Sequence, residues 1–160
     1  MATSNKNLSD YDKTTIPNAK GLRFGIVVSE WNDNITEALY EGAYQTLIEH
    51  QVHNNDIIRW NVPGSFELIY GCKKMLQQDV DAVIAVGSVI QGETKHFDFV
   101  CEGVTHGIKD LNVMHDVPVI YCLLTDNTME QAIARSGGKY GNKGIEAAVT
   151  AIKMAVLNKQ

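Results

Sequence analysis

The sequence predicts an α/β protein, a flavodoxin-like three-layer αβα sandwich with a four-stranded parallel sheet. Short apolar runs rich in β-branched residues alternate with longer segments whose apolar residues recur every three or four positions. Each apolar run ends at a glycine, a proline or a polar loop. Strands that alternate with helices form a parallel sheet covered on both faces. Right-handed crossovers then make the flavodoxin-like topology the natural one.

The first part of the chain supplies a polar arm, a strand and a helix. Residues 1–20 are rich in Ser, Thr, Asn, Asp and Lys, and they cannot bury enough apolar surface to order themselves alone. We therefore expect a flexible arm, ordered by a neighbouring subunit, ahead of one domain at residues 21–160. Residues 22–29 predict a strand that is buried on both faces towards its end. Residues 35–50 predict a helix, because their apolar residues lie about four apart.

The next unit is a strand, a helix and the most apolar strand of the chain. Residues 57–62 predict a strand that the breaker Pro63-Gly64 ends. Residues 66–77 carry apolar side chains at helical spacing, and Ser65 is well placed as the N-cap of that helix. Residues 82–86 are small or β-branched throughout, which indicates a buried strand.

The last part of the chain continues the alternation and adds one helix. We expect a helix at about residues 97–112 and a strand at residues 117–124. A short helix follows, with Asn127 as its N-cap, and it ends at about Arg135 before Ser-Gly-Gly. Residues 139–144 predict a glycine-bearing loop, and residues 145–156 an amphipathic final helix.

Bulk properties exclude several classes of protein. The 160 residues suggest one domain whose hydrophobic core needs no disulfide bonds or metal ions for stability. A net charge of −5, with the acids spread along the chain, gives no electrostatic basis for binding nucleic acid. No apolar run approaches the roughly 20 residues of a membrane span, and the N-terminus lacks a signal peptide. We therefore expect a cytoplasmic protein that binds neither nucleic acid nor membrane.

Cysteine usage agrees with an intracellular location. Cys72, Cys101 and Cys122 are an odd number, lie far apart and include no C-x-x-C spacing. This pattern indicates reduced thiols and not a disulfide framework. Cys101 and His106 lack further ligands at useful spacing, so we expect no metal site.

Residues 87–98 form the strongest candidate for a binding loop. They follow a buried strand and precede a helix, and open α/β sheets place their ligands at the carboxyl ends of strands. The start of the helix offers unpaired N–H groups and a positive dipole end to an anion. His96 adds a group that transfers protons near neutral pH. The other four histidines lie on helix faces or in connecting loops. His96 is therefore the one candidate for chemistry, and its alternative interpretations are a surface histidine or a cap of the helix.

Four loops should line one crevice at that edge of the sheet. They cover residues 31–32, 64–67, 88–96 and 121–125. Trp31, Phe66 and Tyr121 each read either as a packed core side chain or as a platform for a ligand ring. Together, at three strand ends, they suggest an aromatic-lined pocket with a few polar groups.

Two charged residues near this edge also have two interpretations. Glu67 is either a surface acid that favours a helix N-terminus or an acceptor for ligand hydroxyls. Arg135 is either a cation in a last helical turn or a planar clamp for a phosphate. The phosphate-loop, dinucleotide and nucleophile-elbow fingerprints are all absent, so we expect no nucleotide cofactor.

Four ordered segments resemble the lumazine synthase family. They are VPGSFEL at 62–68, GSVIQGETKHFD at 87–98, LTDNTMEQ at 124–131 and GNKGIEAA at 141–148. The resemblance covers residues 22–157 and leaves the arm outside. It implies condensation of 5-amino-6-ribitylaminouracil with 3,4-dihydroxy-2-butanone 4-phosphate to 6,7-dimethyl-8-ribityllumazine, with loss of phosphate and water. This is the penultimate step of riboflavin biosynthesis, and it requires neither a metal nor a cofactor.

The resemblance also implies a role for each matching residue. His96 is the proton-transfer residue, and Trp31 stacks on the pyrimidine ring. Residues 65–67 hold the ring and the ribityl chain, and residues 88–90 read the pyrimidine edge. Glu93 and Thr94 match the phosphate-binding turn, and Arg135 matches the phosphate clamp. Asn32 and Lys143 match positions near the ribityl chain and the phosphate. The full set of expected substrate-binding residues is Trp31, Asn32, Ser65, Phe66, Glu67, Ser88, Val89, Ile90, Glu93, Thr94, Tyr121, Arg135 and Lys143.

Three positions depart from the pattern of the family. Trp31 and Tyr121 stand where phenylalanine is common, and Cys122 stands at a position that is often glycine. Trp31 remains a stacking platform, although a larger one. The hydroxyl of Tyr121 must find a hydrogen-bond partner.

The resemblance implies a homo-oligomer with active sites between neighbouring subunits. Members of the family occur as pentamers, decamers or 60-mers, and the short loop at residues 136–142 resembles those that assemble into 60-mers. Riboflavin synthase is a candidate partner. Two other classes remain open: a lumazine or flavin receptor that keeps the pocket without the chemistry, and a flavodoxin-like electron carrier.

Overall fold

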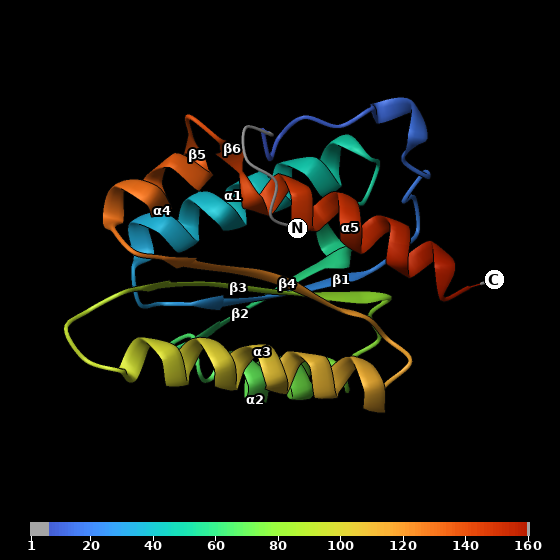
Figure 1. Cartoon of the computed structure of the whole chain (residues 1–160). Helices are drawn as coiled ribbons and strands as arrows, with labels where there is room; N and C mark the ends of the chain where they lie inside the picture. The colour runs from blue at the N-terminus through green and yellow to red at the C-terminus, as the bar shows by residue number, and fades with distance from the viewer. Residues whose placement is uncertain (1–6, 160) are drawn as a thin grey trace.

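The computed structural model describes residues 7–159 and contains a four-stranded parallel sheet (Figure 1). The strands lie in the order β2-β1-β3-β4. They are β1 (Phe24–Ser29), β2 (Ile57–Val62), β3 (Ala82–Ile90) and β4 (Val119–Asp126). The predicted three-layer α/β fold is confirmed.

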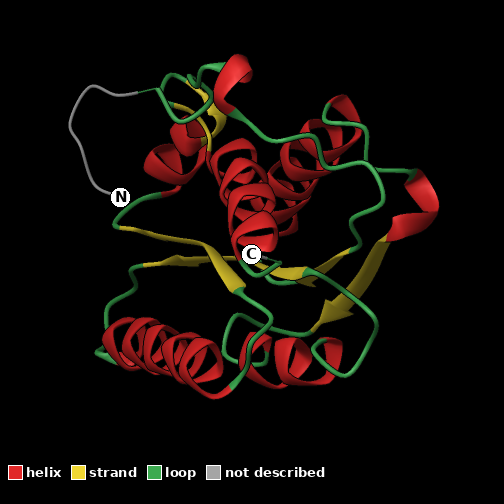
Figure 2. Cartoon of the chain, turned by 90° about the vertical axis from the view of Figure 1, so that its right-hand side faces the viewer, coloured by secondary structure: helices red, strands yellow, loops and turns green. Residues whose placement is uncertain are grey.

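Helices cover both faces of the sheet (Figures 1 and 2). The helices α1 (Asp33–Glu49), α4 (Met129–Arg135) and α5 (Lys143–Leu157) lie on one face. The helices α2 (Leu68–Met75) and α3 (His96–Met114) lie on the other. Two 3-10 turns, η1 (Lys13–Thr15) and η2 (Asn54–Asp56), complete the elements apart from a small hairpin. Within residues 7–159, no helix combines the length and apolar character needed to cross a membrane.

The sheet separates two hydrophobic cores. Along β1, Ile26 packs in the core under α1 and α5, whereas Val27 packs in the core under α2 and α3. Every residue of β1 is buried, as expected for a central strand of a parallel sheet. Cys72 lies in one core and Cys122 in the other, and burial raises the pKa of each thiol to about 12. Both thiols are therefore unreactive.

The two strands beside the candidate loop extend further than the sequence predicts. β3 continues from Val86 to Ile90, and β4 continues from Leu124 to Asp126, because the two strands pair up to Ile90 and Asp126. Gly87 and Ser88 are residue types that are typical of loops, but pairing with β4 keeps both residues in β3. The predicted ends of these two strands were wrong, and Tyr121 lies inside β4, well before its carboxyl end at Asp126.

Two predicted helix caps were also wrong. α2 begins at Leu68 with Glu67 as N-cap residue, so Ser65 lies outside the helix and its hydroxyl caps nothing. Thr128, not Asn127, caps α4, and its hydroxyl accepts a hydrogen bond from the Gln131 N–H at 3.3 Å. In both cases the helix starts later than the sequence pattern indicates.

The predicted loop before the last helix contains a small antiparallel hairpin, β5 (Ser136–Gly138) and β6 (Gly141–Asn142). Asn142 caps α5 through a 2.8 Å bond from the Gly144 N–H, and it donates to the Ala38 carbonyl at 2.9 Å. A Cβ on Gly144 would lie 1.9 Å from the Leu39 carbonyl oxygen. Only glycine therefore permits α5 to pack so closely on α1.

The described part of the arm lies against the domain. The Leu8 N–H bonds to the Tyr140 carbonyl at 2.7 Å, and Lys13 pairs with Glu49 at 2.8 Å. Ala19 is fully buried. Residues 1–6 of the arm lie outside the described residues. The flexibility of the arm, and its ordering by a neighbouring subunit, remain predictions.

Candidate active site

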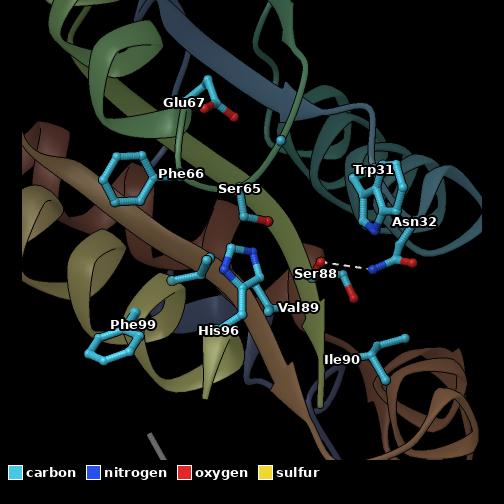
Figure 3. A pocket seen from close by; sticks show the side chains of 12 residues that line it. Trp31, Asn32, Ser65, Phe66, Glu67, Ser88, Val89, Ile90, His96 and Phe99 are labelled. Atoms are coloured by element: carbon cyan, nitrogen blue, oxygen red, sulfur yellow. Dashed lines mark hydrogen bonds between the residues drawn. The ribbon is translucent and has the colours of Figure 1, made fainter. Parts of the chain in front are cut away.

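A cavity of about 700 Å³ opens at the carboxyl ends of the strands (Figure 3). It lies where the strand order reverses between β1 and β3, the position at which open α/β sheets bind ligands. Its volume falls within the range of about 300–1,000 Å³ for small-molecule sites. The residues that line it are Trp31, Asn32, Gly64, Ser65, Phe66, Glu67, Ser88, Val89, Ile90, His96, Phe99 and Val100.

The loop after β1 forms one side of the cavity. Trp31 is 72% exposed, which excludes the core-plug interpretation and leaves its ring faces open to a ligand. Asn32 has left-handed backbone angles (φ 61°, ψ 48°), which asparagine tolerates better than most residues. Its side-chain amide donates a 3.0 Å hydrogen bond to the Ser88 carbonyl, drawn in Figure 3. This bond fixes the Trp31 loop to β3.

Two buried serines supply unused polar groups to the cavity. The hydroxyls of Ser65 and Ser88 are buried and make no hydrogen bond among the described residues. A buried polar group without a partner costs about 1–3 kcal/mol. A ligand that hydrogen-bonds to these hydroxyls therefore removes this cost.

His96 projects into the middle of the cavity, with Trp31 on one side and Phe66 on the other in Figure 3. It is the first residue of α3, and its backbone N–H donates to the Thr94 hydroxyl at 3.3 Å. Its imidazole makes no hydrogen bond within residues 7–159, so both ring nitrogens can engage a ligand. The turn before it thus orients the backbone and leaves the side chain available.

The remaining predicted site residues lie outside the cavity of their own chain. Tyr121 extends from the middle of β4, and its hydroxyl meets that of Thr105 at 3.0 Å. The Lys143 ammonium donates to Glu146 at 2.8 Å. Arg135, at the end of α4, lies beside Asp126. Glu93 and Thr94 are exposed in the turn before α3 and do not line the cavity. The twelve lining residues consequently include neither lysine nor arginine.

Sequence reasoning missed two lining residues, Phe99 and Val100, whereas Gly64 lies in a loop that was predicted to line the crevice. Phe99 lies in the helix predicted at residues 97–112, and its side chain is 68% exposed. It lies three positions after His96, and residues at that spacing share a helix face. The spacing was the available signal, because a residue one turn beyond a ligand-facing histidine lies over the same cavity.

Known proteins with similar sequences identify the family of this chain. Residues 21–159 match the family model described as 6,7-dimethyl-8-ribityllumazine synthase. A protein of that name from Flavobacterium johnsoniae is 73% identical over all of this chain and 85% of its own length. Another, from Christiangramia forsetii, is 70% identical over 99% of this chain and 96% of its own length.

The chain belongs to the 6,7-dimethyl-8-ribityllumazine synthase family. The matched residues begin directly after the predicted arm and include every candidate site residue. The predicted resemblance to lumazine synthases is therefore confirmed.

The structure accounts for the three departures from the common lumazine synthase pattern. Trp31 presents a larger ring surface at the mouth of the cavity than phenylalanine would. The extra hydroxyl of Tyr121 finds Thr105 as its partner, and burial raises the pKa of Tyr121. Cys122 is fully buried in the core under α1 and α5 and reaches no ligand.

Proposed function

We infer that the chain catalyses the condensation of 5-amino-6-ribitylaminouracil with 3,4-dihydroxy-2-butanone 4-phosphate. The products are 6,7-dimethyl-8-ribityllumazine, phosphate and water, in the penultimate step of riboflavin biosynthesis. One observation carries this inference beyond the family match. An exposed indole, two unpartnered serine hydroxyls and an unpartnered imidazole line the same cavity. The indole can stack on a substrate ring, the hydroxyls can hydrogen-bond to the polar edge of that ring, and the imidazole can transfer protons.

The aminouracil is proposed to occupy the cavity between Trp31 and β3. The exposed indole offers a stacking face, and aromatic stacking contributes about 0.5–1.5 kcal/mol beyond area burial. Ser88, Val89 and Ile90 at the end of β3 would read the edge of the pyrimidine. Ser65, Phe66 and Glu67 would hold the ring and the ribityl hydroxyls, and Asn32 lies beside them.

His96 is proposed to move protons during the condensation. Attack of the amine on the ketone, loss of water to form the imine and ring closure each require a proton to leave nitrogen or to reach oxygen. A positioned histidine provides about 10²–10⁴-fold for such transfers. The position of His96 inside the cavity supports this role.

The phosphate is proposed to bind beside His96, at the turn that contains Glu93 and Thr94. α3 has 19 residues and begins at this turn, so its free N–H groups and dipole favour an anion there. The backbone N–H groups, not the Glu93 carboxylate, would face the phosphate. Arg135 and Lys143 are the cations proposed to complete the phosphate site.

We propose that the enzyme is a homo-oligomer whose active sites lie between neighbouring copies. The cavity of one chain contains no cation, and Tyr121, Arg135 and Lys143 lie elsewhere on the same chain. A second copy could bring Arg135 and Tyr121 to the open side, where Trp31, Phe66 and Phe99 are exposed. Light scattering is expected to give the mass of a 60-mer, and a mass near one pentamer contradicts that assembly.

Incubating the purified chain with both substrates tests the proposed activity directly. Formation of 6,7-dimethyl-8-ribityllumazine, followed by its absorbance, supports the enzyme. A receptor would bind the product but form none, and an electron carrier would be purified with bound flavin. Absence of product with active substrates contradicts the proposed function.

The lack of a side chain at Gly103 is predicted to determine where the Phe66 ring lies. A Cβ on Gly103 would lie 2.8 Å from Cε2 of Phe66, so Gly103→Ala must displace this lining residue. We expect a roughly threefold rise in KM for the aminouracil. Overpacking costs about 1–3 kcal/mol, and the exposed Phe66 ring can shift to relieve part of that cost.

Gly107→Ala is the matched control for this prediction. It adds the same methyl group on α3 but meets Ile69, which does not line the cavity. Equal changes in KM for the two variants would contradict a specific role for Phe66. Steady-state kinetics with the aminouracil varied gives both values.

Three further proposals follow from the sequence. Residues 1–20 are proposed as an N-terminal arm that precedes the domain at 21–160, supported by a family match that starts at residue 21. The three free cysteines support a cytoplasmic location. Riboflavin synthase is the proposed partner, because it would consume the product, and co-sedimentation of the two proteins tests the association.

A further inference from the structure

Asp126 is a buried acid that the proposed mechanism does not use. It is the last residue of β4, and its side chain is only 7% exposed. One carboxylate oxygen, Oδ2, is fully buried and has no hydrogen-bond partner among the described residues. Burial raises the pKa of Asp126, while Arg135 lowers it. Charged groups are rarely buried without a function or a counter-ion, so this carboxylate requires an explanation.

Arg135 is the cation that lies against this acid. Its Nη1 atom is 3.6 Å from Oδ1 of Asp126 and 3.4 Å from the Gln131 carbonyl oxygen. The guanidinium carbon lies 5.3 Å from the centre of the Tyr140 ring, within cation–π range. Three neighbours from β4, α4 and the β5-β6 turn therefore hold one arginine.

The polar contacts of Arg135 involve only one nitrogen of the guanidinium group, Nη1. Among residues 7–159, Nη1 makes the only hydrogen bond and the only ion pair of this side chain. Nε and Nη2 make none, and the side chain is 40% exposed. An arginine presents five N–H groups in a planar fork, and two of them on one edge match two oxygens of a phosphate. The fork is thus anchored at Nη1 and open along the Nε–Nη2 edge.

We propose that Asp126 is a positioning residue that holds Nη1 of Arg135, so that the Nε–Nη2 edge is presented to the phosphate of the butanone substrate. This inference rests on the proposed function, because it assigns Asp126 a role through the Arg135 clamp. A free arginine side chain samples many rotamers, and ordering it on binding has an entropic cost. The buried acid restricts that motion before the substrate arrives. Asp126 acts on the cation through the 3.6 Å ion pair between Oδ1 and Nη1, and it does not itself touch the substrate.

Asp126→Ala is expected to raise KM for the butanone phosphate about tenfold, which corresponds to roughly 1.4 kcal/mol. The value of kcat and the KM for the aminouracil should each change less than about twofold, since neither depends on the orientation of the phosphate clamp. Asp126→Asn keeps the size and polarity of the side chain but removes the charge that pairs with Nη1 of Arg135, so its KM is expected between those of the wild type and the alanine variant. This nearly isosteric variant also covers the case in which Asp126→Ala does not fold.

Glu130→Gln is the matched control, because it removes an exposed acid of α4 that does not contact Arg135. Its kinetics should equal those of the wild type. An unchanged or lowered KM for the phosphorylated substrate in Asp126→Ala would overturn the proposal, and a lowered one would show that the acid competes with phosphate.

A double-mutant cycle separates this inference from the proposed function. If Asp126 acts through Arg135, adding Asp126→Ala to Arg135→Ala should cause no further rise in KM. A further tenfold rise in the double variant contradicts action through Arg135. If Arg135→Ala raises KM but Asp126→Ala does not, only the positioning role fails. If Arg135→Ala has no effect, the clamp itself fails, and the role of Asp126 fails with it.

Discussion

Replacing His96 by alanine is expected to lower kcat for lumazine formation by about 10²-fold or more, within the roughly 10²–10⁴-fold range of general acid–base catalysis. His96 lines the cavity, and its ring has no partner within residues 7–159. The substitution should therefore remove a proton-transfer group without breaking a hydrogen bond inside the chain. Initial rates of product formation, with both substrates saturating, measure the effect.

Two controls separate chemistry from assembly in this experiment. His106→Ala removes an exposed histidine from the same helix, ten positions away and outside the cavity. Its turnover should match that of the wild type. Light scattering should give the same particle mass for both variants, because neither histidine is buried. A His96→Ala enzyme with undiminished kcat would remove His96 from the mechanism.

Replacing Arg135 by alanine is expected to raise KM for the butanone phosphate by about 10–100-fold. A hydrogen bond to a charged group contributes about 1.5–3 kcal/mol, and the phosphate is the only charged part of that substrate. The KM for the aminouracil should remain within about twofold of the wild-type value. Steady-state kinetics with each substrate varied in turn provides the comparison.

Arg135→Lys refines this prediction, since lysine keeps the charge but lacks the planar fork. Its KM should fall between those of the wild type and Arg135→Ala. Lys153→Ala removes an exposed cation of α5 outside the cavity and should change neither KM. Equal KM values for wild type and Arg135→Ala would show that the phosphate binds without this residue.

The candidate active site could be predicted in part because its residues cluster in a few short segments. His96 follows a buried strand and begins a helix, and both features are visible in the order of apolar residues. Trp31 and Phe66 follow strand ends for the same reason. Parallel strands bring their carboxyl ends to one edge, so local pattern was enough to assemble most of the cavity.

Other predictions failed where the outcome depended on pairing between distant segments. The hydrogen-bonded register between Ile90 and Asp126 extends both strands beyond their apolar runs. Tyr121, which was grouped with the loops at the strand ends, lies inside β4, where its hydroxyl meets that of Thr105. The short β5-β6 hairpin was missed for the same reason, because its glycine-rich segments carry no apolar alternation.

The sequence by itself determined the α/β class, the four strands and five helices, and the identity of the loop that carries His96. These properties depend on hydrophobic periodicity and on glycine and proline positions, which are local. Only the tertiary structure decided which side chains share the cavity, that Asp126 lies beside Arg135, and that this cation lies outside the cavity of its own chain. The reason is physical: such contacts join residues from different elements, and their geometry follows from strand register and helix packing.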